Sequence, residues 1–256
     1  MMLIFISLIV TLIINFLLFF VAFKRQSDKL TDFAYSLSFI IVTLYVLLVT
    51  SQHSLPLVIM SLMVIAWALR LGIFLVYRIR KSGKDARFDE IRSHFGQFLK
   101  FWLGQGVVAW FLLLPLLFVA LNDKAAISPL FWVGCIIWLI GVSVESVADI
   151  QKYRFNQNPK NKGTWIDSGV WKYSRHPNYF GEICVWVGMY VAAFASLTVL
   201  ERVIGVASPV AIAISLLFIS GIPILEKSAD KRWGGQKAYQ AYKRRTSILI
   251  PLWRKK

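Results

Sequence analysis

The sequence predicts an all-α integral membrane protein, a bundle of seven transmembrane helices with short cytoplasmic interfacial helices. Composition is the first reason, because 57% of the 256 residues are hydrophobic and only 16% are charged. The mean hydropathy of +0.62 is too high for an ordinary soluble domain of this size. The second reason is that seven stretches are long enough for a bilayer core, which needs roughly 20 helical residues. The third is that basic residues are concentrated in alternate connections.

Short connections separate the seven apolar stretches, and no long linker, low-complexity run or internal repeat interrupts them. We therefore expect a single domain over residues 1–256. We expect the first stretch to be a span rather than a signal peptide, because no basic segment precedes it and it exceeds the roughly 7–15 residues of a signal h-region. The predicted spans are 2–23, 33–51, 55–77, 98–121, 128–148, 179–200 and 203–225.

The formal net charge of +16 is distributed unevenly along the chain. Of the 29 Lys and Arg residues, 26 lie in four alternate connections. By the positive-inside rule these connections face the cytoplasm, which places the N-terminus outside and the C-terminus inside. Topology and attraction to anionic membrane lipid account for the charge, so we expect no nucleic-acid partner. The four connections are residues 24–32, 78–100, 149–178 and 226–256.

The basic connections carry their own structural signals. Residues 78–100 mix cations with aromatic and aliphatic side chains, which predicts an amphipathic segment at the membrane interface. The stretch "NPKNKG" (158–163) carries turn signals. The tail predicts a helix from Glu226 to about Thr246, broken at Gly234-Gly235, before "SILIPLW" returns to the membrane surface.

Metal and disulfide chemistry are not expected. The two cysteines, Cys135 and Cys184, fall inside predicted spans and form no CxxC motif. The three histidines, His53, His94 and His176, are widely separated in the chain.

An ionisable residue inside a span costs a few kcal/mol, so each one is a candidate functional residue. Arg70 lies eight residues before Arg78, at the basic end of its span. That separation is about 12 Å of helix, at the limit of what an extended arginine side chain can reach. Arg70 therefore either serves a site inside the bundle or forms a buried ion pair with a carboxylate.

The stretch "GVSVESVADIQKYRF" (141–155) holds two acids on one helical face. Glu145 and Asp149 are spaced i, i+4, and Asp149 and Lys152 are spaced i, i+3. One interpretation is a helix end whose carboxylates pair with Lys152 and Arg154. The other, favoured because Glu145 lies a full turn deeper, is that the acids bind hydroxyls or amides of a polar ligand.

The stretch "WKYSRHPNYFGE" (171–182) predicts a helix that begins at Pro177, a residue suited to the first helical turn. Arg175 and His176 precede this helix as two adjacent basic residues. A helix N-terminus carries free N–H groups and a partial positive charge, so this end of the helix is suited to bind a phosphate.

Asn178 and Glu182 follow on one face of the same helix, at i and i+4. They suit hydrogen bonds to an uncharged amide or a ribose hydroxyl. An aromatic belt at the membrane interface would account for Tyr179 but not for this buried polar pair.

The last candidate site is in the tail, where Glu226 ends the seventh span and Tyr239 and Tyr242 lie among several cations. Binding to anionic lipid would explain the cations equally well, so both interpretations remain open.

These motifs resemble the steroid 5-alpha-reductase superfamily, and specifically a bacterial branch of it. The resemblance rests on "SRHPNYFGE", on "ESVADIQKYRF" before it and on "Y..Y......IP" at the end. A looser version of the same loop and tail occurs in isoprenylcysteine carboxyl methyltransferases. The resemblance implies a seven-helix bundle in the bacterial inner membrane that binds NADPH from the cytoplasm and an isoprenoid or steroid enone from the bilayer.

By this resemblance, Asp149 matches the family's acid at the cytoplasmic end of span five. Asn178 and Glu182 match its cofactor-contacting amide and acid. Combined with the candidates above, the predicted NADPH-binding residues are Arg70, Glu145, Asp149, Lys152, Arg154, Arg175, His176, Asn178, Tyr179, Glu182, Glu226 and Tyr242.

The substrate end departs from the family's pattern. Where steroid reductases have a Gln-Glu pair and a Tyr, this chain has Gln52 and His53, and Trp67. A neutral histidine can still polarise a carbonyl, so Gln52 and His53 are the predicted catalytic residues, although His53 also suits an interfacial loop. We expect an NADPH-dependent oxidoreductase that acts on a CH–CH group of a lipid-soluble substrate slimmer than a steroid.

Two alternatives remain open. One is an S-adenosylmethionine-dependent membrane methyltransferase, and the other is a non-catalytic lipid-binding or sensor protein on the same scaffold. The expected partners are a lipid-soluble small molecule and membrane lipid, with no protein partner.

Overall fold

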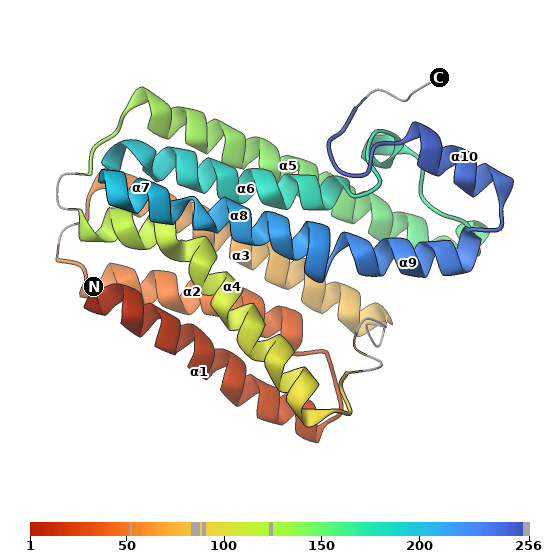
Figure 1. Ribbon diagram of the computed structural model, residues 1–256, viewed down its shortest axis with the longest axis horizontal. Helices are drawn as coiled ribbons and strands as arrows, with labels where there is room; N and C mark the ends of the chain where they lie inside the picture. The colour runs from red at the N-terminus through yellow and green to blue at the C-terminus, as the bar shows by residue number, and fades with distance from the viewer. Residues whose placement is uncertain (52, 83–87, 89–90, 123–124, 253–256) are drawn as a thin grey trace. The chain divides into compact units, whose positions relative to one another are not determined.

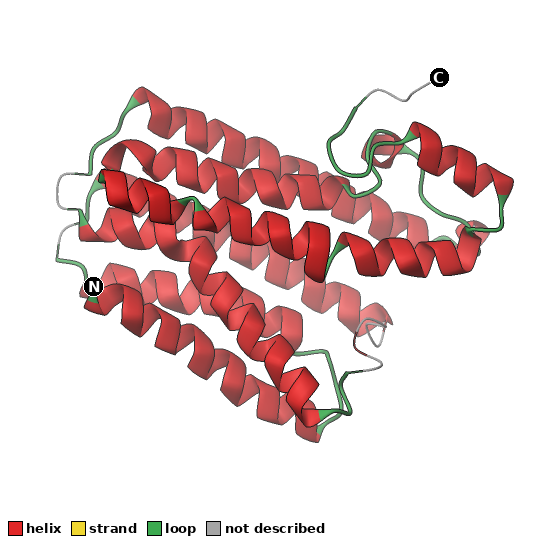
Figure 2. Cartoon of the chain, in the orientation of Figure 1, coloured by secondary structure: helices red, strands yellow, loops and turns green. Residues whose placement is uncertain are grey.

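The computed structural model confirms the predicted fold class. It describes residues 1–51, 53–82, 88, 91–122 and 125–252, without the side chains of 80–82. All regular secondary structure in these ranges is helical (Figure 2). Seven helices among the described residues are long and apolar enough to cross a membrane, as in a multi-pass membrane protein. They are Met2–Lys24, Thr31–Val49, Leu55–Ile79, Phe95–Leu121, Pro129–Gln157, Pro177–Ser196 and Val199–Trp233.

The fifth helix is longer than the sequence predicted. Helix α5 (Pro129–Gln157) continues past residue 148, because a polar sequence without Gly or Pro can continue a helix outside the membrane. It ends before Asn158, which a proline follows, and proline disfavours helical geometry in the preceding residue. A short 3₁₀ turn, η2 (Pro159–Asn161), follows and confirms the predicted turn.

The seventh span consists of several segments rather than one continuous helix. These are α7 (Val199–Gly205), α8 (Ala207–Ile214), a π-helical turn η5 (Ser215–Ile219) and α9 (Ile222–Trp233). After α9 the chain turns at Gly234-Gly235 and enters α10 (Lys237–Arg245), which confirms the predicted break in the tail helix.

The prediction for residues 78–100 is only partly covered. Helix α3 (Leu55–Ser82) and helix α4 (Phe95–Leu121) occupy the two ends of this range. Residues 83–87 and 89–90, the centre of the predicted amphipathic segment, lie outside the described residues.

The chain divides into two compact units (Figure 1). Unit 1 comprises Met1–Trp132 and Met189–Ala211, and unit 2 comprises Val133–Gly188 and Ile212–Lys256. Whether both belong to one domain over 1–256 stays a prediction.

In unit 1, α1 (Met2–Lys24) packs on α2 (Thr31–Val49) and α4, and α2 packs on α3. Phe19 is at the centre of an aromatic cluster that includes Phe98 and Trp102. Polar groups are buried beside it: Asn15 donates to Ser38 Oγ at 3.0 Å and accepts from Gln105 at 3.1 Å. Unit 1 therefore combines apolar packing with interhelical hydrogen bonds, as bilayer-embedded bundles do.

In unit 2, α5 and α6 (Pro177–Ala193) run side by side and approach each other at glycines (Figure 1). A Cβ atom on Gly181 would lie 2.6 Å from the backbone nitrogen of Glu145, and one on Gly188 would lie 2.5 Å from that of Trp138. Small residues at these positions are what allow the two backbones to come so close.

Candidate functional site

The close contact between α5 and α6 brings the predicted acidic face of α5 beside the predicted ligand-binding face of α6. Glu145 packs against Gly181, the residue before Glu182, and is only 2% exposed. Asp149, one turn further along α5, is 9% exposed. The two acids of α5 are therefore buried in unit 2, whereas Asn178 and Glu182 of α6 are half-buried.

The loop before α6 is fixed to α5 by an aromatic anchor. Trp171 is buried and donates from Nε1 to the carbonyl of Ala148 at 3.0 Å. Lys152 lies over the Trp171 ring at 4.6 Å from its centroid, a favourable cation–π contact. The predicted pairing of Lys152 with the α5 carboxylates stays a prediction, and the observed contact of this lysine is with Trp171.

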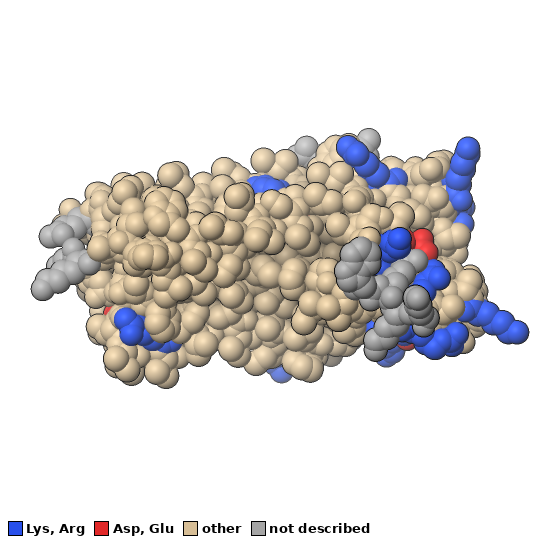
Figure 3. All heavy atoms as spheres, turned by 90° about the horizontal axis from the view of Figure 1, so that it is seen from above, with Lys and Arg blue, Asp and Glu red and all other residues tan. Residues whose placement is uncertain are grey.

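Glu226 of α9 is the centre of an ion-pair cluster. Arg175 Nη1 donates to its Oε2 at 2.6 Å, and His176 Nε2 donates to its Oε1 at 2.9 Å. Lys243 of α10 is 3.3 Å from the same Oε2 and also pairs with Asp230 at 2.6 Å. One carboxylate thus joins the loop before α6, α9 and α10, and Figure 3 shows basic side chains and acidic atoms close together at the α10 end.

Figure 3 also shows a long, uncharged surface along the helices beside this charged end. This contrast agrees with a membrane-facing stretch that gives way to a charged face outside the membrane.

His176, one of the two basic residues before α6, is a weaker base than an exposed histidine and is mainly uncharged at neutral pH, because its pKa is lowered. Burial lowers the pKa of His176, and nearby Lys152 and Arg175 act in the same direction, against the opposing effect of Glu226. Since the Glu226 carboxylate can only accept, the proton of a neutral His176 is on Nε2. Its Nδ1 is then a bare acceptor, and it has no hydrogen-bond partner among the described residues.

This protonation state predicts a pH dependence. The folded chain binds the His176 proton more weakly than the unfolded chain, whose histidine has a pKa near 6.5. The contribution of His176 to stability is therefore present above about pH 6.5 and is lost as the pH falls through the lower folded pKa. When the pH is lowered from 8 to 5, the midpoint of thermal unfolding should fall less in His176→Gln than in the parent protein. Equal decreases in the two proteins would contradict the prediction.

An aromatic cluster of Trp165 with Tyr239 and Tyr242 of α10 packs next to the ion pairs. The Trp165 ring centroid lies 5.0 Å from that of Tyr239 and 6.2 Å from that of Tyr242. Tyr242 donates to the carbonyl of Trp171 at 3.2 Å. Burial and the nearby carboxylates of Glu226 and Asp230 raise the pKa of Tyr239 to about 12, so its phenol stays protonated at physiological pH.

The C-terminal strap, residues 246–252, fastens to the same loop. Ser174 and Ser247 form a parallel bridge, in which the Arg175 backbone N–H donates to the Ser247 carbonyl at 2.8 Å. The buried Ser174 hydroxyl donates to the Leu249 carbonyl at 2.6 Å. The backbone that carries Arg175 and His176 is therefore held from the tail side as well as by Glu226.

Other predicted site residues lie in unit 1 or at the surface. Arg70 is half-buried, with its guanidinium 5.9 Å from the Phe74 ring centroid. His53 is exposed and contacts the Leu47 carbonyl at 2.8 Å, and Gln52 lies outside the described residues. Arg154 is exposed.

Lys243, Asp230 and Trp165 of this cluster were absent from the predicted site. Lys243 pairs with Glu226, and Trp165 supports the two tyrosines. The i, i+4 spacings of Glu226 with Asp230 and of Tyr239 with Lys243 could have indicated that Lys243 belongs to the site. No local pattern indicated Trp165, because its partners lie in a distant segment of the chain.

The residues present fit a nucleoside-type cofactor by one structural criterion. Ten buried polar atoms of the described residues lack a hydrogen-bond partner, and three of them are His176 Nδ1, Arg175 Nε and Thr246 Oγ1. They offer an acceptor, a donor and a hydroxyl, which complement the amides, hydroxyls and phosphates of such a cofactor. A buried polar atom without a partner costs roughly 1–3 kcal/mol, so a ligand or water that satisfies these atoms would stabilise the fold.

Similarity to known proteins is limited but informative. No solved structure matches the chain significantly. A probable O-methyltransferase, ustE, from Ustilaginoidea virens is 38% identical over 52 residues, which are 20% of this chain and 18% of that protein. The chain thus matches less than a fifth of this relative's length.

A family model covers far more of the sequence. It matches residues 18–246, which include α2 to α10 and every residue of the Glu226 cluster. The chain therefore belongs to the DUF1295 family, whose members are described as proteins of unknown function. This family is related to the steroid 5-alpha-reductase superfamily.

Proposed function

We propose that this protein is an NADPH-dependent membrane reductase. It reduces an activated C=C bond, that of an enone, in a lipid-soluble steroid-, isoprenoid- or acyl-like substrate. When bound, NADPH would supply the hydride for the beta carbon, and a proton added to the alpha carbon completes the reduction.

The observation that carries this proposal is the packing of Glu145 against Gly181 in unit 2. It brings α5 at Glu145 against the helix that carries Asn178 and Glu182, and the Glu226 cluster holds the loop before that helix. Apolar helices rarely bury such polar side chains without a function. The relation of the family to the steroid 5-alpha-reductase superfamily supports a reductase over other cofactor-dependent enzymes.

The side chains have distinct proposed roles. Asn178 and Glu182 bind amide or hydroxyl groups, whereas Arg175 attracts phosphate. Glu226 orients Arg175 and His176 through the contacts of 2.6 and 2.9 Å. Gln52 and His53 lie in the connection between the second and third spans, which the charge distribution places on the opposite side of the membrane from the cofactor site, so we assign them no role in polarising the carbonyl.

Cofactor binding tests the proposal. Asn178→Ala and Glu182→Ala are each expected to weaken NADPH binding by about 1–3 kcal/mol, the usual cost of removing a buried or charged hydrogen-bond partner. Ligand-induced thermal shifts of the purified protein, with NADPH, NADH and S-adenosylmethionine in parallel, measure this. Ser143→Ala is a suitable control, since the Ser143 hydroxyl is exposed and donates to the Leu139 carbonyl of its own helix.

A specific observation favours a second candidate, an S-adenosylmethionine-dependent methyltransferase. The partial match to a protein named as a probable O-methyltransferase is that observation. If both α6 variants bound NADPH like the parent while S-adenosylmethionine still stabilised them, the methyltransferase would replace the reductase.

The proposed location is the bacterial inner membrane, with the N-terminus outside and the C-terminus in the cytoplasm. Because 26 of the 29 Lys and Arg residues lie in alternate connections, a reporter fused after Lys256 is expected to report cytoplasm. A periplasmic signal from that fusion would overturn the orientation and, with it, the cytoplasmic entry of the dinucleotide.

A further inference from the structure

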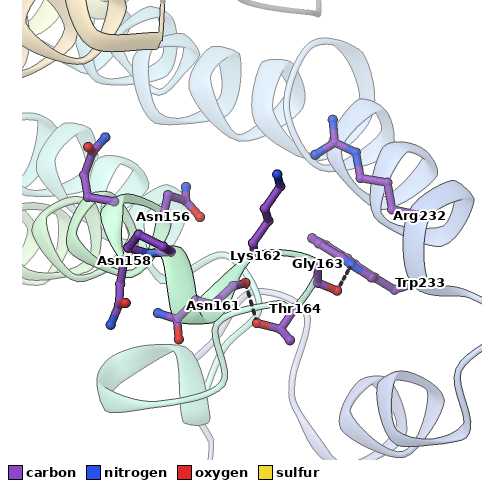
Figure 4. Close-up of a pocket in the computed structure, with 10 residues that line it drawn as sticks. Asn156, Asn158, Asn161, Lys162, Gly163, Thr164, Arg232 and Trp233 are labelled. Atoms are coloured by element: carbon purple, nitrogen blue, oxygen red, sulfur yellow. Dashed lines mark hydrogen bonds between the residues drawn. The ribbon is translucent and has the colours of Figure 1, made fainter.

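A polar cleft of about 390 Å³ lies in unit 2, between the end of α5, the following turn and the end of α9 (Figure 4). None of its lining residues belongs to the predicted cofactor site. Its volume is at the small end of the ~300–1,000 Å³ typical of ligand sites, so it suits a small polar group rather than a dinucleotide. The lining residues are Asn156, Gln157, Asn158, Pro159, Asn161, Lys162, Gly163, Thr164, Arg232 and Trp233.

Local interactions hold the walls of this cleft in place. Asn158 Oδ1 accepts from the backbone N–H of Lys160 at 3.0 Å and fixes the turn after α5. Gly163 has a φ of +84°, a left-handed geometry that favours glycine. The indole of Trp233 donates from Nε1 to the Gly163 carbonyl at 2.9 Å, which ties this turn to α9.

Two cations and two amides of the cleft have unused hydrogen-bonding capacity. Lys162 and Arg232 are exposed, and neither forms an ion pair or side-chain hydrogen bond with any described residue. Figure 4 shows Lys162 on the turn after α5 and Arg232 on α9, with Trp233 beside Gly163. The side-chain amides of Asn156 and Gln157 likewise have no partner within the described ranges. Two cations in one cleft attract an anion, and the amides can bind hydroxyl groups next to it.

The cleft also lies at a defined level of the protein. Gln157 ends one apolar helix that is long enough to cross a membrane, and Trp233 ends another. Both helix ends lie beyond the predicted membrane spans, which end at residues 148 and 225, so the cleft is on the aqueous side of the headgroup region. Basic residues near a membrane surface are attracted to anionic headgroups.

From this placement we propose that the cleft binds a phosphate ester of a small polyol, with the phosphate between Lys162 and Arg232 and the hydroxyls on the amides. The headgroup of an anionic glycerophospholipid and a soluble glycerol phosphate share this chemistry. This site is separate from the proposed NADPH site and does not depend on it.

The test uses the full-length protein purified in an uncharged detergent. Thermal shift and native mass spectrometry are recorded with phosphatidylglycerol, phosphatidylcholine, glycerol 3-phosphate and inorganic phosphate. Lys162→Ala and Arg232→Ala are each expected to weaken binding of phosphatidylglycerol or glycerol phosphate about fivefold, as expected for one basic residue near an anionic headgroup. Lys160→Ala and Lys231→Ala are matched controls, because these lysines are exposed sequence neighbours that do not line the cleft.

The four ligands separate the possible sources. A response to phosphatidylglycerol alone identifies a lipid, and an equal response to glycerol phosphate identifies a soluble ester, provided that only the cleft variants lose it. Equal losses in the cleft and control variants would show general charge attraction and overturn the proposal. Loss of the response on adding NADPH would also overturn it, because the cleft would then belong to the cofactor site. Lys162→Arg should retain binding, which separates loss of charge from loss of fold.

Discussion

Glu226→Ala is expected to destabilise the protein by about 2–4 kcal/mol. Removing one partner of a fully buried ion pair costs roughly 3–5 kcal/mol, because the remaining charge has no compensation. The expected loss here is somewhat smaller, since the Arg175 side chain is 12% exposed and that of Glu226 is 17% exposed. Three groups would lose their common partner: Arg175, His176 and Lys243.

Chemical unfolding of the full chain in detergent micelles measures this loss. Asp230→Ala is the matched control, because Asp230 lies one turn further along α9, is 48% exposed and has an ion pair with Lys243. An exposed pair contributes only about 0–1 kcal/mol, so this control should be nearly neutral. Equal effects of the two variants would show that Glu226 does not stabilise the cluster.

The Glu226 variant also has a consequence for the proposed cofactor site. The loop that carries Arg175 would then lose its ion pairs and keep its hydrogen bonds to the strap and the Trp171 anchor. We expect weaker ligand binding together with lower stability. The stability and ligand affinity of Glu226→Gln should fall between those of the parent protein and Glu226→Ala, because the amide can still accept a hydrogen bond but carries no charge.

Gly181→Val is expected to have a comparable effect of about 3 kcal/mol or more. Overpacking a close contact typically costs about 1–3 kcal/mol, and here the obstacle is backbone that cannot move aside. A Cβ atom at Gly181 would lie 2.6 Å from Glu145 N and 2.7 Å from the Gly141 carbonyl oxygen. The two helices would therefore have to separate, which would also move Glu145 away from the Glu182 face.

Gly104 of α4 provides the control. A Cβ atom there meets nothing within 4 Å, so Gly104→Val should change stability by less than about 1 kcal/mol. Thermal unfolding of both variants makes the comparison, and Gly181→Ala should show an intermediate loss. A Gly181→Val protein as stable as Gly104→Val would mean that α5 and α6 do not pack this closely.

The spans, turns and helix breaks that depend on residues adjacent in the sequence could be predicted without the structure. The seven spans follow from the length and apolarity of each stretch, because a bilayer imposes both on every segment separately. The break at Gly234-Gly235 and the turn at Asn158-Pro159 follow from the backbone preferences of glycine and proline. The extended end of α5 was missed because polarity marks the end of a membrane span, whereas a helix ends only where its backbone geometry changes.

Tertiary structure alone decided how the site residues combine. Arg175 and Glu226 are 51 positions apart, and no local pattern in either segment indicates their 2.6 Å contact. The same structure lowers the pKa of His176, since desolvation and two nearby cations outweigh the carboxylate that it contacts. The sequence determined which polar side chains enter the membrane-spanning helices, because a buried charge is conspicuous among apolar residues. Only the folded chain determines which of them meet, since glycine contacts such as Gly181 with Glu145 set the distance between helices.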